Sequence, residues 1–101
     1  MSGDTFKDKV VLITGAGGGL GRTFALAFAA EGAMVAAADL NEVGAKETAE
    51  LIIAGGGTAI GLGVDVTKAA SLETLVNAVK DWSGRVDVLV NNAAIYAGLK
   101  R

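Results

Sequence analysis

Residues 10–21 have the sequence VVLITGAGGGLG, which is the most informative segment for predicting the fold. It opens with four consecutive aliphatic residues, Val10 to Ile13, and so short an apolar run is typical of a strand that is buried on both faces. The run ends at Thr14, and five of the next seven residues are glycine. From Leu20 onward the apolar side chains recur with a helical period. We therefore expect a strand, a glycine-rich turn and a helix in immediate succession.

The remainder of the chain repeats this alternation of strand and helix. Phe24 and Phe28 lie on one helical stripe, and Gly32 is placed to end that helix. We expect the two phenylalanines and Trp82 to fill the core. Apolar periodicity then predicts a strand over residues 33–38, a helix over 43–54, a strand over 58–66, a helix with Thr67 as its N-cap that ends before Gly84, and a strand over 86–90.

The order of the expected elements is β-α-β-α-β-α-β. Strands that alternate with helices of about 10–15 residues are joined by right-handed crossovers and form a parallel sheet. No repeat, linker or block of like charge divides the 101 residues, and a chain of this length makes one domain at most. The sequence therefore predicts a single α/β domain.

The composition excludes several classes of function. The net charge of −2 and the pI near 4.9 argue against nucleic acid as a partner, because neutralising its backbone requires a basic face. Cys and His are both absent, which excludes disulfides, zinc sites and Ser-His or Cys-His catalysis within this chain. No apolar run is long enough to span a membrane, so we expect no membrane partner and a cytoplasmic location.

The glycine loop, residues 15–21, is suited to bind a phosphate group. The start of a helix carries free N–H groups and the positive end of the helix dipole, and both stabilise an anion. Side chains would hold the phosphate away from these N–H groups, whereas glycine has none. Glycine also adopts the positive φ values that a tight turn requires. Position and composition together predict a phosphate site.

Two general phosphate motifs do not fit this loop. The dinucleotide fingerprint G-x-G-x-x-G matches in no register, and the spacing that is present is Gly15, Gly19 and Gly21. A P-loop, G-x-x-x-x-G-K-[ST], fails because Ala16 replaces its first glycine and Arg22 replaces its lysine. A tight turn without a ligand is the other alternative, although such a turn needs only one or two glycines.

Asp39 follows the second predicted strand, at about the 20-residue separation from the glycine loop that is expected of an acid that binds an adenosine ribose. Its carboxylate would also repel a 2′-phosphate, and neither Gly18 nor Leu40 supplies a compensating positive charge. The sequence therefore favours NAD over NADP. The alternative is that Asp39 is a solvated aspartate at the end of a strand.

Four motifs, spread over most of the chain, resemble those of the short-chain dehydrogenase/reductase family. They are Thr14-Gly15-x-x-x-Gly19-x-Gly21, Asp39, Asp65-Val66 and Asn91-Asn92-Ala93-Ala94. The resemblance implies a Rossmann-type doubly wound parallel sheet, of which residues 1–101 would be an incomplete N-terminal, NAD-binding part. If the chain were complete, we would expect the strand over residues 86–90 to lie bare at the sheet edge.

The resemblance also implies a role for each motif in binding NAD. Asp65-Val66 would lie against the adenine, with Asp65 receiving its amino group, and residues 91–94 would line the nicotinamide-side ribose. Ala94 departs from the family, which usually has glycine there. The residues expected to contact NAD are Thr14, Gly15, Gly17, Gly18, Gly19, Leu20, Gly21, Asp39, Leu40, Asp65, Val66, Asn91, Asn92, Ala93 and Ala94.

By the same resemblance, the function is that of an NAD-dependent oxidoreductase, which transfers hydride between NAD and a small-molecule alcohol or ketone. The family's catalytic Ser, Tyr, Lys and Asn lie beyond the Asn motif, so we expect this chain to be the inactive cofactor-binding part of a homo-oligomeric enzyme. Tyr96 and Lys100 have the Tyr-x-x-x-Lys spacing but follow that motif too closely to be the catalytic pair. The alternative is a non-redox nucleotide-binding module, either a degenerate P-loop protein or an NAD sensor.

Overall fold

The computed structural model describes residues 5–93 of the chain. Strands and helices alternate along these residues, as predicted. The elements are β1 (Val10–Thr14), α1 (Gly19–Ala30), β2 (Met34–Asp39), α2 (Glu42–Ala54), β3 (Thr58–Gly63), α3 (Ala69–Ser83) and β4 (Val88–Asn91).

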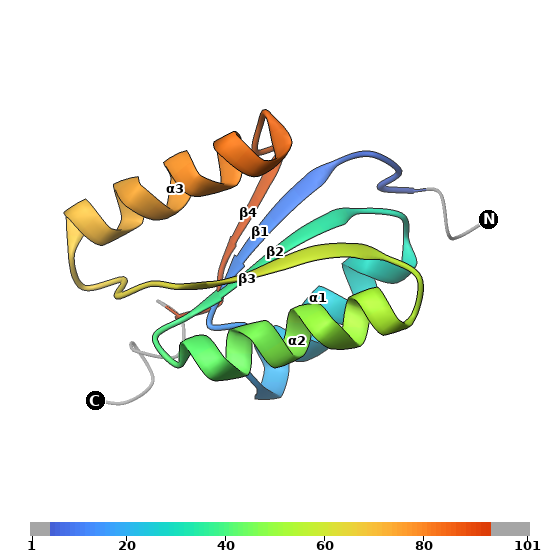
Figure 1. Cartoon of the computed structure of the whole chain (residues 1–101), viewed down its shortest axis with the longest axis horizontal. Helices are drawn as coiled ribbons and strands as arrows, with labels where there is room; N and C mark the ends of the chain where they lie inside the picture. The colour runs from blue at the N-terminus through green and yellow to red at the C-terminus, as the bar shows by residue number, and fades with distance from the viewer. Residues whose placement is uncertain (1–4, 94–101) are drawn as a thin grey trace.

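The four described strands form one parallel sheet in the order β3-β2-β1-β4. Val11 in β1 lies opposite Val35 on one side and Val88 on the other. Helices α1 and α2 cover one face of the sheet and α3 covers the opposite face (Figure 1). The prediction of a Rossmann-type doubly wound α/β fold is confirmed. Because the strands are parallel, their carboxyl ends meet at one edge of the sheet.

The first strand is buried on both faces, which explains its uninterrupted apolar sequence. Val11 and Ile13 pack on the side of α1 and α2, whereas Val10 and Leu12 pack on the side of α3. Phe24 and Phe28 pack against the first of these clusters and Trp82 against the second, so the prediction that they fill the core is confirmed.

Several predicted boundaries are wrong at the carboxyl edge of the sheet. The third strand ends at Gly63 rather than at Val66. Lys68, not Thr67, is the N-cap residue of α3, and it makes no side-chain cap. Thr67 instead donates its hydroxyl to Asp65 Oδ1, 2.6 Å away. A local side-chain hydrogen bond therefore competes with both the strand and the helix cap.

The fourth strand begins at Val88 rather than at Val86, because Asp87 closes the end of the ladder. The Asp87 N–H donates to Val10 O at 2.9 Å, and Asp87 Oδ2 accepts the Val10 N–H at 2.8 Å. Within residues 5–93, β4 pairs only with β1. Leu89 on that strand is 58% exposed. None of the described helices is both long and apolar enough to cross a membrane.

Candidate functional site

A cavity of about 480 Å³ opens at the carboxyl edge of the sheet. We call it the edge cavity, and its walls come from the loops that follow β1, β2, β3 and β4. The residues expected at the cofactor site that line it are Gly15, Gly17, Gly18, Gly19, Leu20, Asp39, Leu40, Asp65, Val66, Asn92 and Ala93. Thr14, Gly21 and Asn91 are not among the lining residues, and Ala94 lies outside the described residues, as do Tyr96 and Lys100.

At three positions of the loop a glycine is required because neighbouring atoms of the protein leave no room for a Cβ. A Cβ at Gly15, where φ is +72°, would lie 2.8 Å from Asn92 Nδ2. A Cβ at Gly17 would lie 2.8 Å from the carboxyl carbon of Asp39, and one at Gly21 would collide with Gly15 O. The loop therefore packs closely against the carboxyl ends of β2 and β4 and against the first turn of α1.

Gly18 and Gly19 differ, because a Cβ at either position would meet no atom of the chain within 4 Å. Gly18 is the N-cap residue of α1 and, as a glycine, has no side chain that could accept the free N–H groups of the helix start. Within residues 5–93, the N–H groups of Gly18, Gly19 and Leu20 have no hydrogen-bond acceptor. These three residues line the edge cavity, so its wall presents unpartnered donors at the positive end of a helix dipole.

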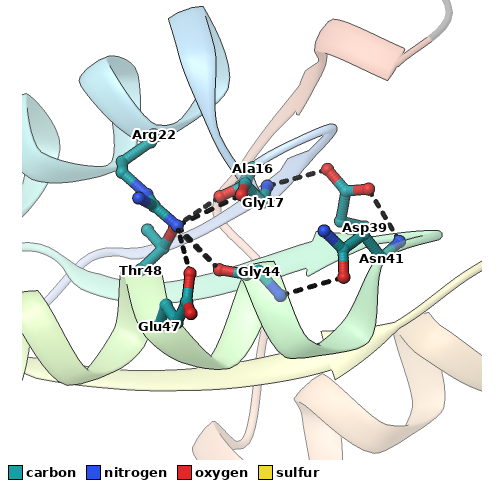
Figure 2. Close-up of polar contacts among 8 residues, drawn as sticks. All are labelled: Ala16, Gly17, Arg22, Asp39, Asn41, Gly44, Glu47 and Thr48. Atoms are coloured by element: carbon teal, nitrogen blue, oxygen red, sulfur yellow. Dashed lines mark hydrogen bonds and ion pairs between the residues drawn. The ribbon is translucent and has the colours of Figure 1, made fainter.

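Asp39 is held at the edge cavity by two backbone donors. Its Oδ2 accepts the Gly17 N–H at 2.7 Å, and its Oδ1 accepts the Asn41 N–H at 2.9 Å (Figure 2). The carboxylate is therefore not a freely solvated strand-end group. The N–H groups of Ala16 and Gly17 are thus bonded to the protein itself, at Ala38 O and Asp39 Oδ2, whereas those of Gly18, Gly19 and Leu20 have no acceptor among residues 5–93.

The segment after β3 is held by hydrogen bonds centred on Asp65. Its Oδ1 accepts both the side-chain hydroxyl and the N–H of Thr67, at 2.6 and 3.0 Å, and its own N–H donates to Ser71 Oγ at 3.0 Å. The hydroxyl bond from Thr67 is the main reason why the pKa of Asp65 is below its usual value. An ionised carboxylate thus stands beside Val66 in the cavity wall.

The asparagines after β4 tie that strand to the glycine loop. Thr14, which is 1% exposed, donates its hydroxyl to Asn91 Oδ1 at 2.8 Å and accepts the Ala93 N–H at 3.3 Å. Asn92 donates through Nδ2 to Gly15 O at 3.2 Å. These contacts give the strand-end amides partners in the protein and fix the cavity wall on the β4 side.

Arg22 and Thr48 were not expected near the site, and the structure connects both of them to the glycine loop. Arg22 points away from the edge cavity and towards α2, where its Nε donates to Thr48 Oγ1 at 2.8 Å (Figure 2). It also donates through Nη2 to Gly17 O and Gly44 O, each at 3.1 Å. No local sequence pattern indicates the contacts with Thr48 and Gly44, because these partners lie 26 and 22 positions further along the chain.

Comparisons with known proteins agree on one family. A family model described as short chain dehydrogenase matches residues 9–101. The chain is 50% identical over 90 residues to an uncharacterized oxidoreductase of Thermotoga maritima, covering 89% of this chain and 35% of that one. It is 47% identical over 89 residues to galactitol 2-dehydrogenase of Agrobacterium fabrum, covering 88% and 34%. The chain thus spans about a third of the length of each of these two curated relatives.

A solved structure shows the same arrangement in space. The crystal structure of hydroxysteroid dehydrogenase from Escherichia coli superposes with a TM-score of 0.82 at 36% sequence identity. The match covers 85% of this chain and 37% of the crystallised one.

Proposed function

Because this chain belongs to the short-chain dehydrogenase/reductase family, we propose that it is the NAD-binding part of an oxidoreductase that transfers hydride between NAD and an alcohol or ketone. The observation that carries this proposal is that the N–H groups of Gly18, Gly19 and Leu20, in the wall of the edge cavity, have no acceptor in the described part of the chain. A helix start of this kind stabilises a pyrophosphate, and the absence of packing neighbours at the two glycines leaves room for it.

The residues around this loop fit the other parts of a dinucleotide. Each Asp39 oxygen accepts one backbone N–H, and a carboxylate oxygen has a second lone pair that a ribose hydroxyl can use. Leu40 and Val66 offer apolar surface for the adenine beside Asp65. Following the family resemblance, residues 91–94 would line the nicotinamide-side ribose. When bound, NAD supplies the hydride acceptor, and this chain binds and orients it.

The charge of the edge cavity supports NAD over NADP. Its lining contains the carboxylates Asp39 and Asp65 and, among the described residues, neither Lys nor Arg. A 2′-phosphate would add negative charge beside Asp39 without a cation to balance it. Arg22 is the charged residue that directly follows the glycine loop, but its guanidinium donates to Thr48 and Gly44 on α2. It is therefore not placed to act as a P-loop lysine or to balance the charge of a 2′-phosphate.

We assign no catalytic residue within residues 5–93. The side chains that catalyse the reaction would lie outside this range. Residues 1–101 are then the N-terminal NAD-binding part of one Rossmann-fold domain, and we expect this part alone to turn over no substrate. Similar proteins include galactitol 2-dehydrogenase and meso-2,3-butanediol dehydrogenase, which supports a small-molecule alcohol or carbonyl compound as the substrate. Assembly into a homo-oligomer and a cytoplasmic location stay predictions.

Titration calorimetry with NADH, NADPH and ATP tests this proposal. We expect NADH to bind most tightly, NADPH more weakly because of Asp39, and ATP weakest. Binding of ATP without binding of NADH would refute the dinucleotide site and favour a non-redox nucleotide module. Gly18→Glu is the matched negative control for NADH binding. A Cβ at this position meets no protein atom within 4 Å, but the glutamate would place a carboxylate at the proposed anion site.

A further inference from the structure

Arg22 bridges the glycine loop and the first turns of α2 without entering the edge cavity. Its guanidinium donates to three acceptors fixed by the fold, Thr48 Oγ1 and the carbonyls of Gly17 and Gly44, at 2.8 to 3.1 Å. A fourth contact, to Glu47 Oε1 at 3.3 Å, is with a side chain that is 60% exposed. The first three contacts therefore define where the guanidinium lies, and the fourth is a weak surface ion pair.

Thr48 is the second half of this bridge. It is fully buried, accepts the Arg22 Nε–H and lies 2.6 Å from Ala16 O. A hydroxyl has one proton, and Ala16 O is a closer acceptor than Gly44 O at 3.2 Å. The carbonyls of Ala16 and Gly17 are consequently both bonded to groups on the α2 side of the loop (Figure 2).

The direction of these two carbonyls determines the direction of the following N–H groups. In a trans peptide the C=O and the N–H point in opposite directions. The Gly17 N–H, opposite Ala16 O, points to Asp39 Oδ2 at 2.7 Å. The Gly18 N–H, opposite Gly17 O, belongs to a residue that lines the edge cavity, and it has no acceptor among the residues that the structure describes. Thr48 thus orients the peptide that holds Asp39, and Arg22 orients the peptide that faces the anion site.

Packing alone does not account for this arrangement. Gly44 already lies against the loop, since a Cβ there would collide with Gly17 O. This contact sets the separation of α2 and the loop but not the rotation of each peptide. Loop glycines rotate easily, so hydrogen bonds to the two carbonyls are what select one rotation. A charged donor on a carbonyl also polarises the peptide and makes its N–H a stronger donor.

We propose that Arg22, supported by Thr48, is a positioning residue for dinucleotide binding. Through Gly17 O it sets the direction and the donor strength of the Gly18 N–H, and so transmits its positive charge to the pyrophosphate without touching it. This inference rests on the proposed function of the site and adds two residues, on α1 and α2, on which cofactor affinity depends.

Variants of both residues test the proposal by NADH fluorescence titration and thermal unfolding. Arg22→Met and Thr48→Val should each raise the Kd for NADH about tenfold, the equivalent of about 1.4 kcal/mol. Thr48→Ser keeps the hydroxyl and should bind NADH within about threefold of the wild type. Glu47→Gln removes only the exposed ion pair and should leave the Kd unchanged.

Arg85→Met provides the control for stability. Arg85 bonds Asp87 and Asp8 O and does not line the edge cavity, so this variant should lower the Tm with no change in Kd. If Arg22→Met and Thr48→Val change the Kd no more than Arg85→Met does at a similar loss of Tm, the positioning role is refuted. If Arg22→Met does not fold, the contrast between Thr48→Val and Thr48→Ser decides the same point.

An amide spectrum of the ligand-free protein separates this inference from the proposed function. Loss of the charged donor on Gly17 O should move the Gly18 amide proton upfield in Arg22→Met, whereas Glu47→Gln should not move it. An unchanged Gly18 amide shift in Arg22→Met would overturn the positioning role. A wild-type protein that binds no NADH would instead overturn the proposed function.

Discussion

Asp39→Asn is the substitution that best separates holding the loop from binding the cofactor. The two carboxylate oxygens of Asp39 accept the N–H groups of Gly17 and Asn41, at 2.7 and 2.9 Å. An asparagine has one acceptor oxygen, and its NH₂ group would face the other N–H with donor against donor. The variant therefore loses a hydrogen bond in the protein whether or not a nucleotide is bound.

The expected cost follows from the charge on the acceptor. A hydrogen bond to a charged group contributes about 1.5–3 kcal/mol, so we expect Asp39→Asn to lose about 2 kcal/mol of unfolding free energy. For a domain of this size that corresponds to a fall of about 8–16 °C in Tm. The Kd for NADH should rise at least about tenfold, because the ribose loses an ionised acceptor.

Chemical denaturation of the ligand-free chain, followed by NADH titration of the same samples, measures both effects. Asp81→Asn removes the same charge from an exposed position on α3 and is the matched control, with little change expected in either quantity. If Asp39→Asn is as stable as Asp81→Asn, the carboxylate does not hold the loop. Asp39→Arg should raise the ratio of NADPH to NADH affinity, but from a destabilised protein, since it removes the same two bonds.

Three further perturbations probe the loop, the sheet and the dependence on pH. Gly18→Glu should leave stability within about 0.5 kcal/mol of the wild type but raise the Kd for NADH at least about tenfold through repulsion of the pyrophosphate; tight NADH binding by this variant would place the anion elsewhere. Gly61→Ala should lose about 1–3 kcal/mol of unfolding free energy, because a Cβ at Gly61 would lie 2.6 Å from the Lys46 Cα; wild-type stability in denaturant titration would contradict that contact. The hydrogen bond from the Val10 N–H is the main reason why the pKa of Asp87 is lowered from 3.8. The ionised Asp87 carboxylate therefore stabilises the folded state above about pH 4, and this stabilisation is lost as the pH falls through the lower pKa of the folded state. Asp87→Asn should therefore be less stable than the wild type at pH 6 and approach it near pH 2, and a constant difference in unfolding free energy would refute this linkage.

Much of the fold could be predicted because its pattern is local. The apolar run at Val10–Ile13, the glycine loop and the helical stripe that follows each depend on residues close in sequence, and the structure confirms all three elements. The boundaries near Val66 and Thr67 could not be predicted by periodicity. There the hydrogen bonds of Asp65 to Thr67 and Ser71 replace the strand and the helix cap.

The α/β alternation, the glycine loop at the start of the first helix and the acid at the end of the second strand could all be read from the amino-acid sequence alone. The bond from the Gly17 N–H to Asp39, and the bond from Arg22 to Thr48, 26 positions further along the chain, became apparent only in three dimensions. Both follow from the parallel sheet. Its crossovers bring the loops after successive strands to one edge, so residues far apart in sequence meet there in contacts that no local periodicity encodes.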